Sequence, residues 1–341
     1  MKRIKINAAT PYEVLVGTDL LKDCGRYIKE TGTKATKLFL VSETNVAPLY
    51  LDKTKASLEE AGFEVLTFVF DAGEQSKTLA TVSKMLGSLA DNAFTRTDAI
   101  VALGGGVTTD MAGFAASIFL RGIKVFQIAT TLLAQVDASV GGKTGVDLPE
   151  GKNLVGAFHQ PSLVICDCDL LKSLSDDLFR EGMGEVIKYA FICDKGLYEM
   201  LKVKLTKESD SVEEVVARCV ELKAYVVEQD EFDNGLRQTL NFGHTIGHVI
   251  ERDSNFTKPH GYCVAKGMAR ISKTSPILPE LIEMLRLYEF PYEDDITTDE
   301  ILSGIMNDKK KRGSNITVAL VNEIGKCELK TMDISEFKRY I

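Results

Sequence analysis

The chain has 341 residues, 45% of them hydrophobic and 26% charged, which is typical of a globular protein long enough for two domains with separate cores. Its formal net charge of −8 argues against general nucleic-acid binding, because phosphate backbones favour basic surfaces. No apolar run reaches the roughly 18 residues of a membrane span, and the N-terminal segment lacks the apolar block of a signal peptide, so we expect a cytoplasmic protein that does not cross a membrane.

The first half of the chain alternates short apolar runs with amphipathic stretches. The apolar runs predict strands at Tyr12–Val16, Lys37–Val41, Glu64–Phe70, Ala99–Leu103, Lys124–Ile128 and Leu163–Cys166. Apolar residues recur at helical spacing in Val46–Ala61 and Leu79–Asn92. This alternation predicts a parallel sheet covered by helices, an α/β domain that we place at residues 1–170.

After about Ser173 the strand signals fade. Helical patterns continue through Arg237 and return at Pro279–Tyr288, and one late strand is expected at Ile316–Val321. We therefore predict a mainly α-helical second domain at residues 171–341, with a boundary that rests on the change of period alone.

Three consecutive glycines follow the predicted strand Ala99–Leu103. Gly104, Gly105 and Gly106 lead into a helix expected to begin at Thr109 or Asp110. Glycines at such a turn let backbone N–H groups approach a pyrophosphate at the positive end of a helix, so a dinucleotide is a suitable ligand. A tight turn without a ligand is the alternative, because the motif is not the GxGxxG fingerprint.

Two later segments carry charged residues in places that suit a binding site. Lys143 and Lys152 lie in a glycine-rich stretch with Asp137 and Asn153 close by, which predicts either a phosphate or carboxylate site or a solvated loop. Further cations and an amide follow at Lys223, Arg237 and Asn241 and in the run Lys309–Arg312, and such a charge run is commonly solvated.

Three of the four histidines lie between Asn241 and Gly261. On a helix His244 and His248 stand one turn apart, and His260 follows a polar loop that could return to them, which outlines a metal site. A solvated helix face is the alternative. A three-ligand catalytic zinc site normally includes a carboxylate, and Glu185, three residues before Lys188 in an apolar segment, is a candidate unless it forms only a salt bridge.

These segments, in this order, resemble the 3-dehydroquinate synthase family, sugar-phosphate cyclases of the shikimate pathway. The resemblance rests on GGGVTTDMAGFAASIFLRG, TTLLAQVDASVGGKTGVDLPEGKNLVGAFHQP, GEVIKYAFI, LNFGHTIGH and the later HG, and it covers nearly the whole chain. It implies a Rossmann-like α/β domain that binds NAD, a helical domain that holds Zn²⁺ or Co²⁺ and substrate, and a homodimer.

The resemblance also implies roles for individual residues. The metal ligands would be Glu185, His244 and His260, with His248 facing substrate instead of the metal. The other substrate contacts would be Asp137, Lys143, Lys152, Asn153, Lys188, Lys223, Arg237, Asn241 and a lysine of the pair Lys309 and Lys310, and Arg121 would reach the neighbouring subunit's substrate. NAD would contact Glu43, Asn45, Glu74, Gln75, Lys77, Gly105, Gly106, Val107, Thr108, Thr109, Asp110, Thr130, Thr131, Leu170, Leu171, Lys172 and Ser173, with Lys143 and Lys152 also near it.

The implied activity is that of a phosphorus–oxygen lyase acting on 3-deoxy-D-arabino-heptulosonate 7-phosphate. Transient oxidation by NAD, elimination of phosphate, reduction and an aldol closure would give 3-dehydroquinate. Five positions depart from the family pattern: Thr109 replaces Gly, Ala72 replaces Asp, Tyr262 replaces Glu, Gly184 replaces Ala and Ala129 replaces Pro. The rival interpretations are another sugar-phosphate cyclase, a metal-dependent polyol dehydrogenase, and a scaffold that binds NAD without catalysis.

Overall fold

The computed structural model describes residues 1–254, 256–294, 296–309 and 315–341. The chain forms two compact units: residues 1–174 with 210–231, and residues 175–209 with 232–341. The sequence pattern had placed everything after residue 170 in the second unit. The difference is α7 (Val212–Gln229), which packs on β1 (Lys2–Ile6) and β2 (Tyr12–Gly17) of the first unit. A helical period shows that α7 has an apolar face but not which sheet that face covers.

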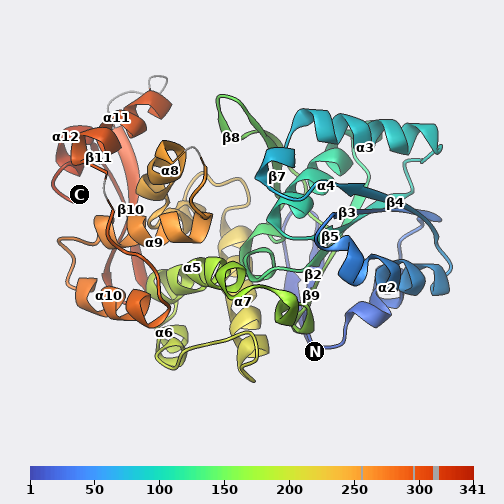
Figure 1. Ribbon diagram of the computed structural model, residues 1–341, viewed down its shortest axis with the longest axis horizontal. Coiled ribbons are helices and arrows are strands. Elements are labelled where there is room, and N and C mark those ends of the chain that lie inside the picture. Colours follow the sequence, from blue (N-terminus) through green and yellow to red (C-terminus); the bar gives the residue numbers. More distant parts are fainter. Residues whose placement is uncertain (255, 295, 310–314) are drawn as a thin grey trace. The chain divides into compact units, whose positions relative to one another are not determined.

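The first unit is built on a seven-stranded sheet with the order β1-β2-β9-β6-β5-β3-β4 (Figure 1). The strands besides β1 and β2 are β3 (Lys37–Glu43), β4 (Glu64–Phe70), β5 (Ala99–Gly104), β6 (Lys124–Ala129) and β9 (Leu163–Asp167). Strand β1 pairs antiparallel with β2, and every other pair is parallel. The predicted strands are therefore confirmed, and the α/β class with them.

The sheet has a hydrophobic core on each face. Leu38 and Leu40 of β3 join the core that includes Leu58 of α2 (Ala47–Glu60) and Ile28 of α1 (Cys24–Glu30). Phe39 and Val41 alternate to the other face, where the core includes residues of α3 (Leu79–Asp91) and α4 (Gly106–Ile118). A strand buried on both faces reads as a continuous apolar run, which is why β3 and β5 were visible in the sequence.

Strands β7 (Lys143–Leu148) and β8 (Gly151–Phe158) form a separate hairpin, where the sequence had predicted only a glycine-rich binding segment or a solvated loop. Val146, Val155 and Ala157 pack into the core that α4 shares. A Cβ on Gly156 would lie 2.1 Å from the carbonyl oxygen of Thr144, so this glycine lets the two strands approach closely. Here the glycines serve strand packing and are not a sign of mobility.

The second unit is mainly helical. Its helices are α5 (Asp176–Cys193), α6 (Lys195–Leu201), α8 (His244–Asp253), α9 (His260–Ile271), α10 (Leu278–Leu287), α11 (Thr298–Lys309) and α12 (Ile334–Phe337). The predicted late strand is β10 (Asn315–Glu323), and it pairs antiparallel with β11 (Lys326–Asp333), which was missed because its sequence is polar and mostly half-buried or exposed. Among the helices that the structure describes, none is long and apolar enough to cross a membrane.

Candidate metal and cofactor sites

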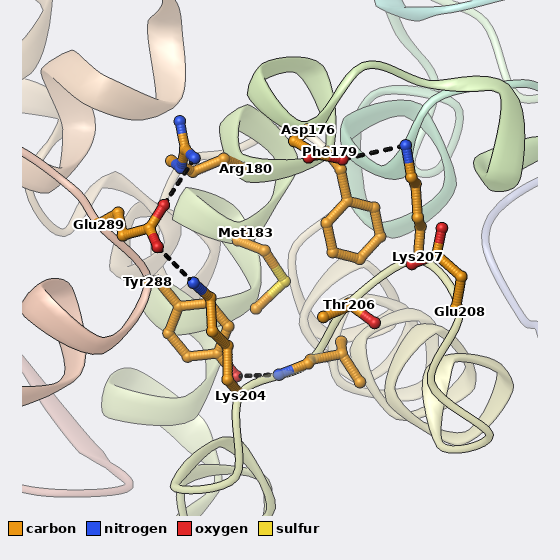
Figure 2. A pocket seen from close by; sticks show the side chains of 11 residues that line it. Asp176, Phe179, Arg180, Met183, Lys204, Thr206, Lys207, Glu208, Tyr288 and Glu289 are labelled. Carbon is orange, nitrogen blue, oxygen red and sulfur yellow. Dashed lines mark hydrogen bonds and ion pairs between the residues drawn. The ribbon is translucent and has the colours of Figure 1, made fainter.

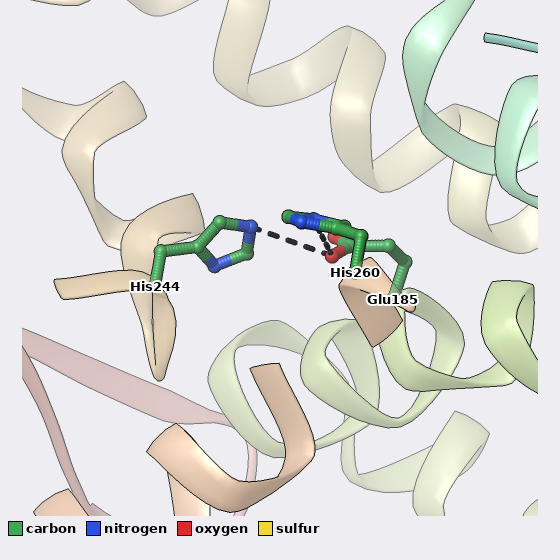
Figure 3. Close-up of side chains that lie close together, drawn as sticks. All are labelled: Glu185, His244 and His260. Carbon is green, nitrogen blue, oxygen red and sulfur yellow. Dashed lines mark ion pairs between the residues drawn. The ribbon is translucent and has the colours of Figure 1, made fainter. Parts of the chain in front are cut away.

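Glu185 lies at the centre of the candidate metal site (Figure 3). Its side chain is fully buried on α5, and its Oε1 atom lies 3.4 Å from Nε2 of both His244 and His260. Within the described part of the chain, this Oε1 atom has no hydrogen-bond partner. One carboxylate oxygen and two imidazole nitrogens that face one another match the donor set of a catalytic zinc or cobalt site.

The other oxygen of Glu185 pairs with Lys188, one turn along α5. Burial raises the pKa of the Glu185 carboxyl, but its neighbours, above all the Lys188 ammonium, outweigh burial and hold this pKa well below its usual range. Glu185 is therefore ionised at neutral pH, as a metal ligand must be.

His244 begins α8 directly after Gly243, whose φ of +80° suits glycine. Its Nδ1 atom lies 3.2 Å from the carbonyl oxygen of Phe242. A proton on Nδ1 can be donated to this carbonyl, which leaves the Nε2 lone pair facing Glu185. Burial lowers the pKa of the His244 imidazole, so the neutral, metal-binding form is favoured.

His248 lies one turn beyond His244, and the two rings meet edge to face with centroids 5.3 Å apart. Its side chain is exposed, and its ring centroid is 6.0 Å from that of His260. His248 thus lies beside the three-residue cluster without belonging to it.

Helix packing places Glu185 next to His260. A Cβ on Gly261 would lie only 2.0 Å from the carbonyl oxygen of Glu181, and one on Gly184 would lie 2.9 Å from the carbonyl oxygen of Gly261. These glycines therefore allow α5 and α9 to touch through their backbones. The Glu181 carboxylate also accepts a hydrogen bond from the backbone N–H of His260 at 3.1 Å, which fixes the start of α9.

Tyr262 follows these residues on α9. Its hydroxyl accepts a hydrogen bond of 2.8 Å from Arg180, and its ring meets Phe290 at 5.4 Å between centroids. Figure 2 shows that Arg180 also pairs with Glu289, which in turn pairs with Lys204 along a cavity of about 250 Å³. Tyr262 therefore joins a paired charge network next to this cavity.

The glycine turn of the first unit leads into a helix that begins earlier in the sequence than predicted. Gly105 precedes α4, which starts at Gly106 and not at Thr109 or Asp110. A Cβ on Gly105 would lie 2.9 Å from Cγ2 of Thr131, so only glycine fits there without a shift. The first N–H groups of an α-helix have no partner within the helix, and this compact turn leaves them suited to a pyrophosphate.

The predicted cofactor residues gather at one edge of the sheet. Strands β3, β5, β6 and β9 are parallel neighbours, and their carboxyl ends meet at that edge. Open α/β sheets bind ligands outside the carboxyl ends of their strands. Glu43 ends β3, and the predicted cofactor residues that follow these four strands are Asn45, the turn Gly105–Asp110, Thr130 and Thr131, and Leu170–Ser173.

Two departures in this region fit the fold locally. The Thr109 hydroxyl donates to the carbonyl oxygen of Gly106 at 3.0 Å, so it bonds within its own helix. Ala72 donates its backbone N–H to the Thr44 hydroxyl at 3.0 Å, and its carbonyl oxygen accepts from Gln75 at 2.8 Å.

Several predicted residues form a charged network in the first unit. The Nζ atom of the buried Lys77 lies 2.6 Å from Oδ2 of Asp110 and 2.6 Å from Oδ1 of Asn153. Asn153 has a φ of +54°, and its backbone N–H donates to Asp147 at 2.7 Å. Lys152, beside it, pairs with Glu74 at 3.3 Å.

Lys223 and Asp137 form a second pair in the first unit. The Nζ atom of Lys223 donates to the backbone carbonyl oxygen of Asp137 at 2.5 Å and to its Oδ1 at 2.6 Å. The helix α7 thus brings Lys223 to the π-helical turn Ala134–Ala138.

The remaining predicted residues are more scattered. Arg121 and Lys143 are exposed, and Arg121 has a φ of +70°. In the second unit Arg237 is buried and Asn241 half-buried, both in the short helix Leu236–Asn241. Lys310 lies outside the described residues.

Sequence reasoning missed Glu251 and Glu181, which both contact His260. The signal for Glu251 was present, because it follows His244 and His248 at positions i+7 and i+3 on the same helix face. Nothing local distinguished Glu181 from a solvated acid in the first half of α5.

Comparison with known proteins covers most of the chain. Residues 67–181 match the family described as 3-dehydroquinate synthase N-terminal, and residues 182–311 match the one described as 3-dehydroquinate synthase C-terminal. A protein of Clostridium botulinum named 3-dehydroquinate synthase is 42% identical over 339 residues, which span 96% of this chain and 97% of the relative.

Two solved structures share the fold along nearly the full length. A 2-deoxy-scyllo-inosose synthase complexed with carbaglucose-6-phosphate, NAD⁺ and Co²⁺ has a TM-score of 0.86 at 25% identity and covers 99% of each chain. A 2-epi-5-epi-valiolone synthase from Streptomyces hygroscopicus, with NAD⁺ and Zn²⁺ bound, has a TM-score of 0.86 at 25% identity and covers 96% of this chain and 95% of that one.

Proposed function

The chain belongs to the 3-dehydroquinate synthase family, and on this premise we propose that it converts 3-deoxy-D-arabino-heptulosonate 7-phosphate to 3-dehydroquinate and phosphate. The observation that carries the proposal is the 42% identity over 96% of the chain to a relative of that name. The reaction makes the protein a phosphorus–oxygen lyase of aromatic amino acid biosynthesis, and we expect it in the cytoplasm.

We propose that Glu185, His244 and His260 hold Zn²⁺ or Co²⁺. The buried Oε1 atom of Glu185 and the two Nε2 atoms at 3.4 Å support this assignment, as does the presence of these metals in the solved cyclases. When bound, the metal would supply a Lewis acid that lowers the pKa of substrate hydroxyls. Lys188 would hold the Glu185 carboxylate in its ionised form.

We propose that NAD binds at the carboxyl edge of the parallel sheet. The backbone N–H groups at the start of α4 would take the pyrophosphate, and the buried Oγ1 atoms of Thr108 and Thr130, which lack partners among described residues, are available to the same ligand. When bound, NAD would supply a reversible hydride acceptor. The remaining proposed contacts are Glu43, Asn45, Glu74, Gln75, Lys77, Gly105, Gly106, Val107, Thr109, Asp110, Thr131, Lys143, Lys152, Leu170, Leu171, Lys172 and Ser173.

The substrate carries a phosphate and a carboxylate, and the chain supplies cations for both. In the first unit we assign substrate binding to Asp137, Lys143, Lys152, Asn153 and Lys223. In the second we assign it to Lys188, Arg237, Asn241, His248 and Lys310. Ammonium, guanidinium and amide donors held in place stabilise charge and orient the reacting atoms, which is where we expect most of the protein's contribution to lie.

We also propose a homodimer in which Arg121 contacts the substrate of the neighbouring subunit. Leu154 and Phe158 are exposed on β8, Ile118 is exposed at the end of α4, which packs against β8, and Leu120 is exposed in the turn that follows α4. Exposed apolar side chains that gather in one patch mark an interface, and these four support the proposed one. Light scattering of the wild type and of Leu154→Asp tests this, and a monomeric wild type would contradict it.

The decisive experiment supplies the purified protein with Zn²⁺, catalytic NAD and 3-deoxy-D-arabino-heptulosonate 7-phosphate. We expect phosphate and 3-dehydroquinate to form in equal amounts, and both to be lost in His260→Ala. Bound metal and NAD without any turnover of this substrate would contradict the proposal and favour another sugar-phosphate cyclase or a non-catalytic scaffold. Stoichiometric NADH release from a polyol would indicate a dehydrogenase instead.

A further inference from the structure

A second carboxylate contacts His260 from the side opposite Glu185. The Oε2 atom of Glu251 lies 3.6 Å from Nδ1 of His260, while Nε2 of the same ring lies 3.4 Å from Glu185. The imidazole of His260 is therefore held between two acids, one facing each of its nitrogens.

Glu251 is an unusual residue for its position. It lies on the buried side of α8, near Ile246, Val249 and Ile250, and only 3% of its surface is exposed. A buried carboxylate costs folding free energy unless partners compensate it, and the His260 imidazole is one such partner.

The contact bears on which nitrogen of His260 keeps its proton once a cation occupies the Glu185 site. An ionised carboxylate can only accept, so Glu251 favours a proton on Nδ1, and Nε2, which faces Glu185, would then be the nitrogen that binds the cation. His244 reaches the same state through a peptide carbonyl, that of Phe242. One imidazole is thus oriented by a neutral dipole and the other by a full negative charge.

We infer that Glu251 is a positioning residue for the metal site: it fixes the tautomer and ring orientation of His260 and makes its Nε2 atom a better donor. Carboxylates that hold a ligating histidine in this way commonly contribute 10- to 100-fold, in rough terms, to metal affinity. The inference rests on the metal site proposed above and adds a residue to it.

A second arrangement of the same side chains must be distinguished from this one. His248, Glu251 and His260 also place potential ligand atoms within 4.8 Å of one another. In that arrangement Glu251 would bind an ion directly, and the protein would take up two ions. Stoichiometry separates the two possibilities.

The test is metal binding by the full-length, metal-free protein, without substrate. Zn²⁺ affinity would be measured by competition with a chromophoric chelator, and the coordination of Co²⁺ by its visible absorption. In Glu251→Leu we expect one bound ion with an affinity roughly 10- to 100-fold below wild type and a changed Co²⁺ spectrum. Glu251→Gln keeps an oxygen acceptor without the charge, so its loss of affinity should be smaller.

Asp253→Asn is the matched control, because it removes a carboxylate from an exposed position of the same helix. We expect wild-type affinity and spectrum from this variant. Wild-type affinity in both Glu251 variants would overturn the inference, and so would two ions in the wild type with one in Glu251→Leu. A wild type that binds no metal would contradict the metal site itself, whereas the outcomes above bear on Glu251 alone.

Discussion

Lys77 in the first unit and Glu185 in the second are both buried charges, but their surroundings differ. The ammonium of Lys77 lies 2.6 Å from Asp110 and 2.6 Å from Asn153, so oxygen acceptors surround it. Glu185 pairs with Lys188 through one oxygen, while its other oxygen has no hydrogen-bond partner among described residues and faces two imidazoles. Protein oxygens thus satisfy the Lys77 ammonium, whereas one oxygen of Glu185 remains for the metal ion proposed above.

The electrostatic consequences also differ. Burial lowers the pKa of Lys77, but the nearby acids Asp110, Glu74 and Asp147 together outweigh burial and raise it above the usual value. Lys77 therefore stays charged and ties Asp110 of α4 to Asn153 of β8. A satisfied buried network of this kind rigidifies its surroundings, whereas a buried oxygen without a partner requires an explanation, which the proposed metal supplies for Glu185.

Glu185→Gln tests the candidate metal site most strongly. The amide oxygen is a weaker ligand and loses the charge that attracts a cation, so we expect Zn²⁺ binding and catalysis to be abolished. Calorimetric titration with Zn²⁺ measures the first and phosphate release the second. Glu199→Gln, an exposed change on α6, should behave as wild type, and retained Zn²⁺ affinity in Glu185→Gln would contradict the site.

Lys77→Met tests the network that Lys77 forms with Asp110 and Asn153. It leaves Asp110 buried without its cation, which should lower the free energy of unfolding by about 3–5 kcal/mol. Urea denaturation measures this, with the exposed Lys55→Met as control, for which less than about 1 kcal/mol is expected. The double variant Lys77→Met/Asp110→Asn should lose less than the sum of its parts, and strict additivity would show that the two residues do not act as a pair.

Gly184→Ala tests the contact between α5 and α9, which places Glu185 next to His260 in the candidate metal site. The added Cβ would lie 2.9 Å from the carbonyl oxygen of Gly261, so α5 and α9 must shift, at a cost of about 1–3 kcal/mol. Weaker Zn²⁺ binding should accompany the loss of stability. Gly261→Ala, with a contact of 2.0 Å to Glu181, should cost more, and the opposite ranking would contradict the packing account.

Thr109→Gly should have the smallest effect. Because the Thr109 hydroxyl bonds within α4, we expect little change in NAD affinity. The change in helix propensity should cost only about 0.3–0.5 kcal/mol, because threonine is itself a much weaker helix former than alanine. Fluorescence titration with NADH and thermal unfolding measure the two quantities. A large gain in NAD affinity would show that the Thr109 side chain obstructs the cofactor.

Much of the fold and part of the candidate metal site could be predicted from the sequence, for physical reasons. Strands such as β3 and β5 are buried on both faces, so they leave continuous apolar runs, and the histidines of α8 sit at helical spacing. Glu185 was a candidate ligand from the sequence alone, but the choice between a ligand and a salt bridge with Lys188 rested on the family resemblance, because the two are locally indistinguishable. The β7–β8 hairpin was hidden because its glycines serve close packing, and the contacts of Glu251 and Glu181 with His260 depend on helices distant in sequence.

The return of α7 to the first unit has a consequence for how the protein is made. A ribosome completes the seven strands of the sheet by residue 167, but the helix that covers β1 and β2 follows only after residues 175–209, which belong to the other unit. Translation adds roughly 5–20 residues per second, so the apolar face of β1 and β2 stays exposed for several seconds before α7 can pack on it. The nascent chain is exposed to aggregation in that interval, and a gene fragment ending at residue 170 would leave the same face bare permanently.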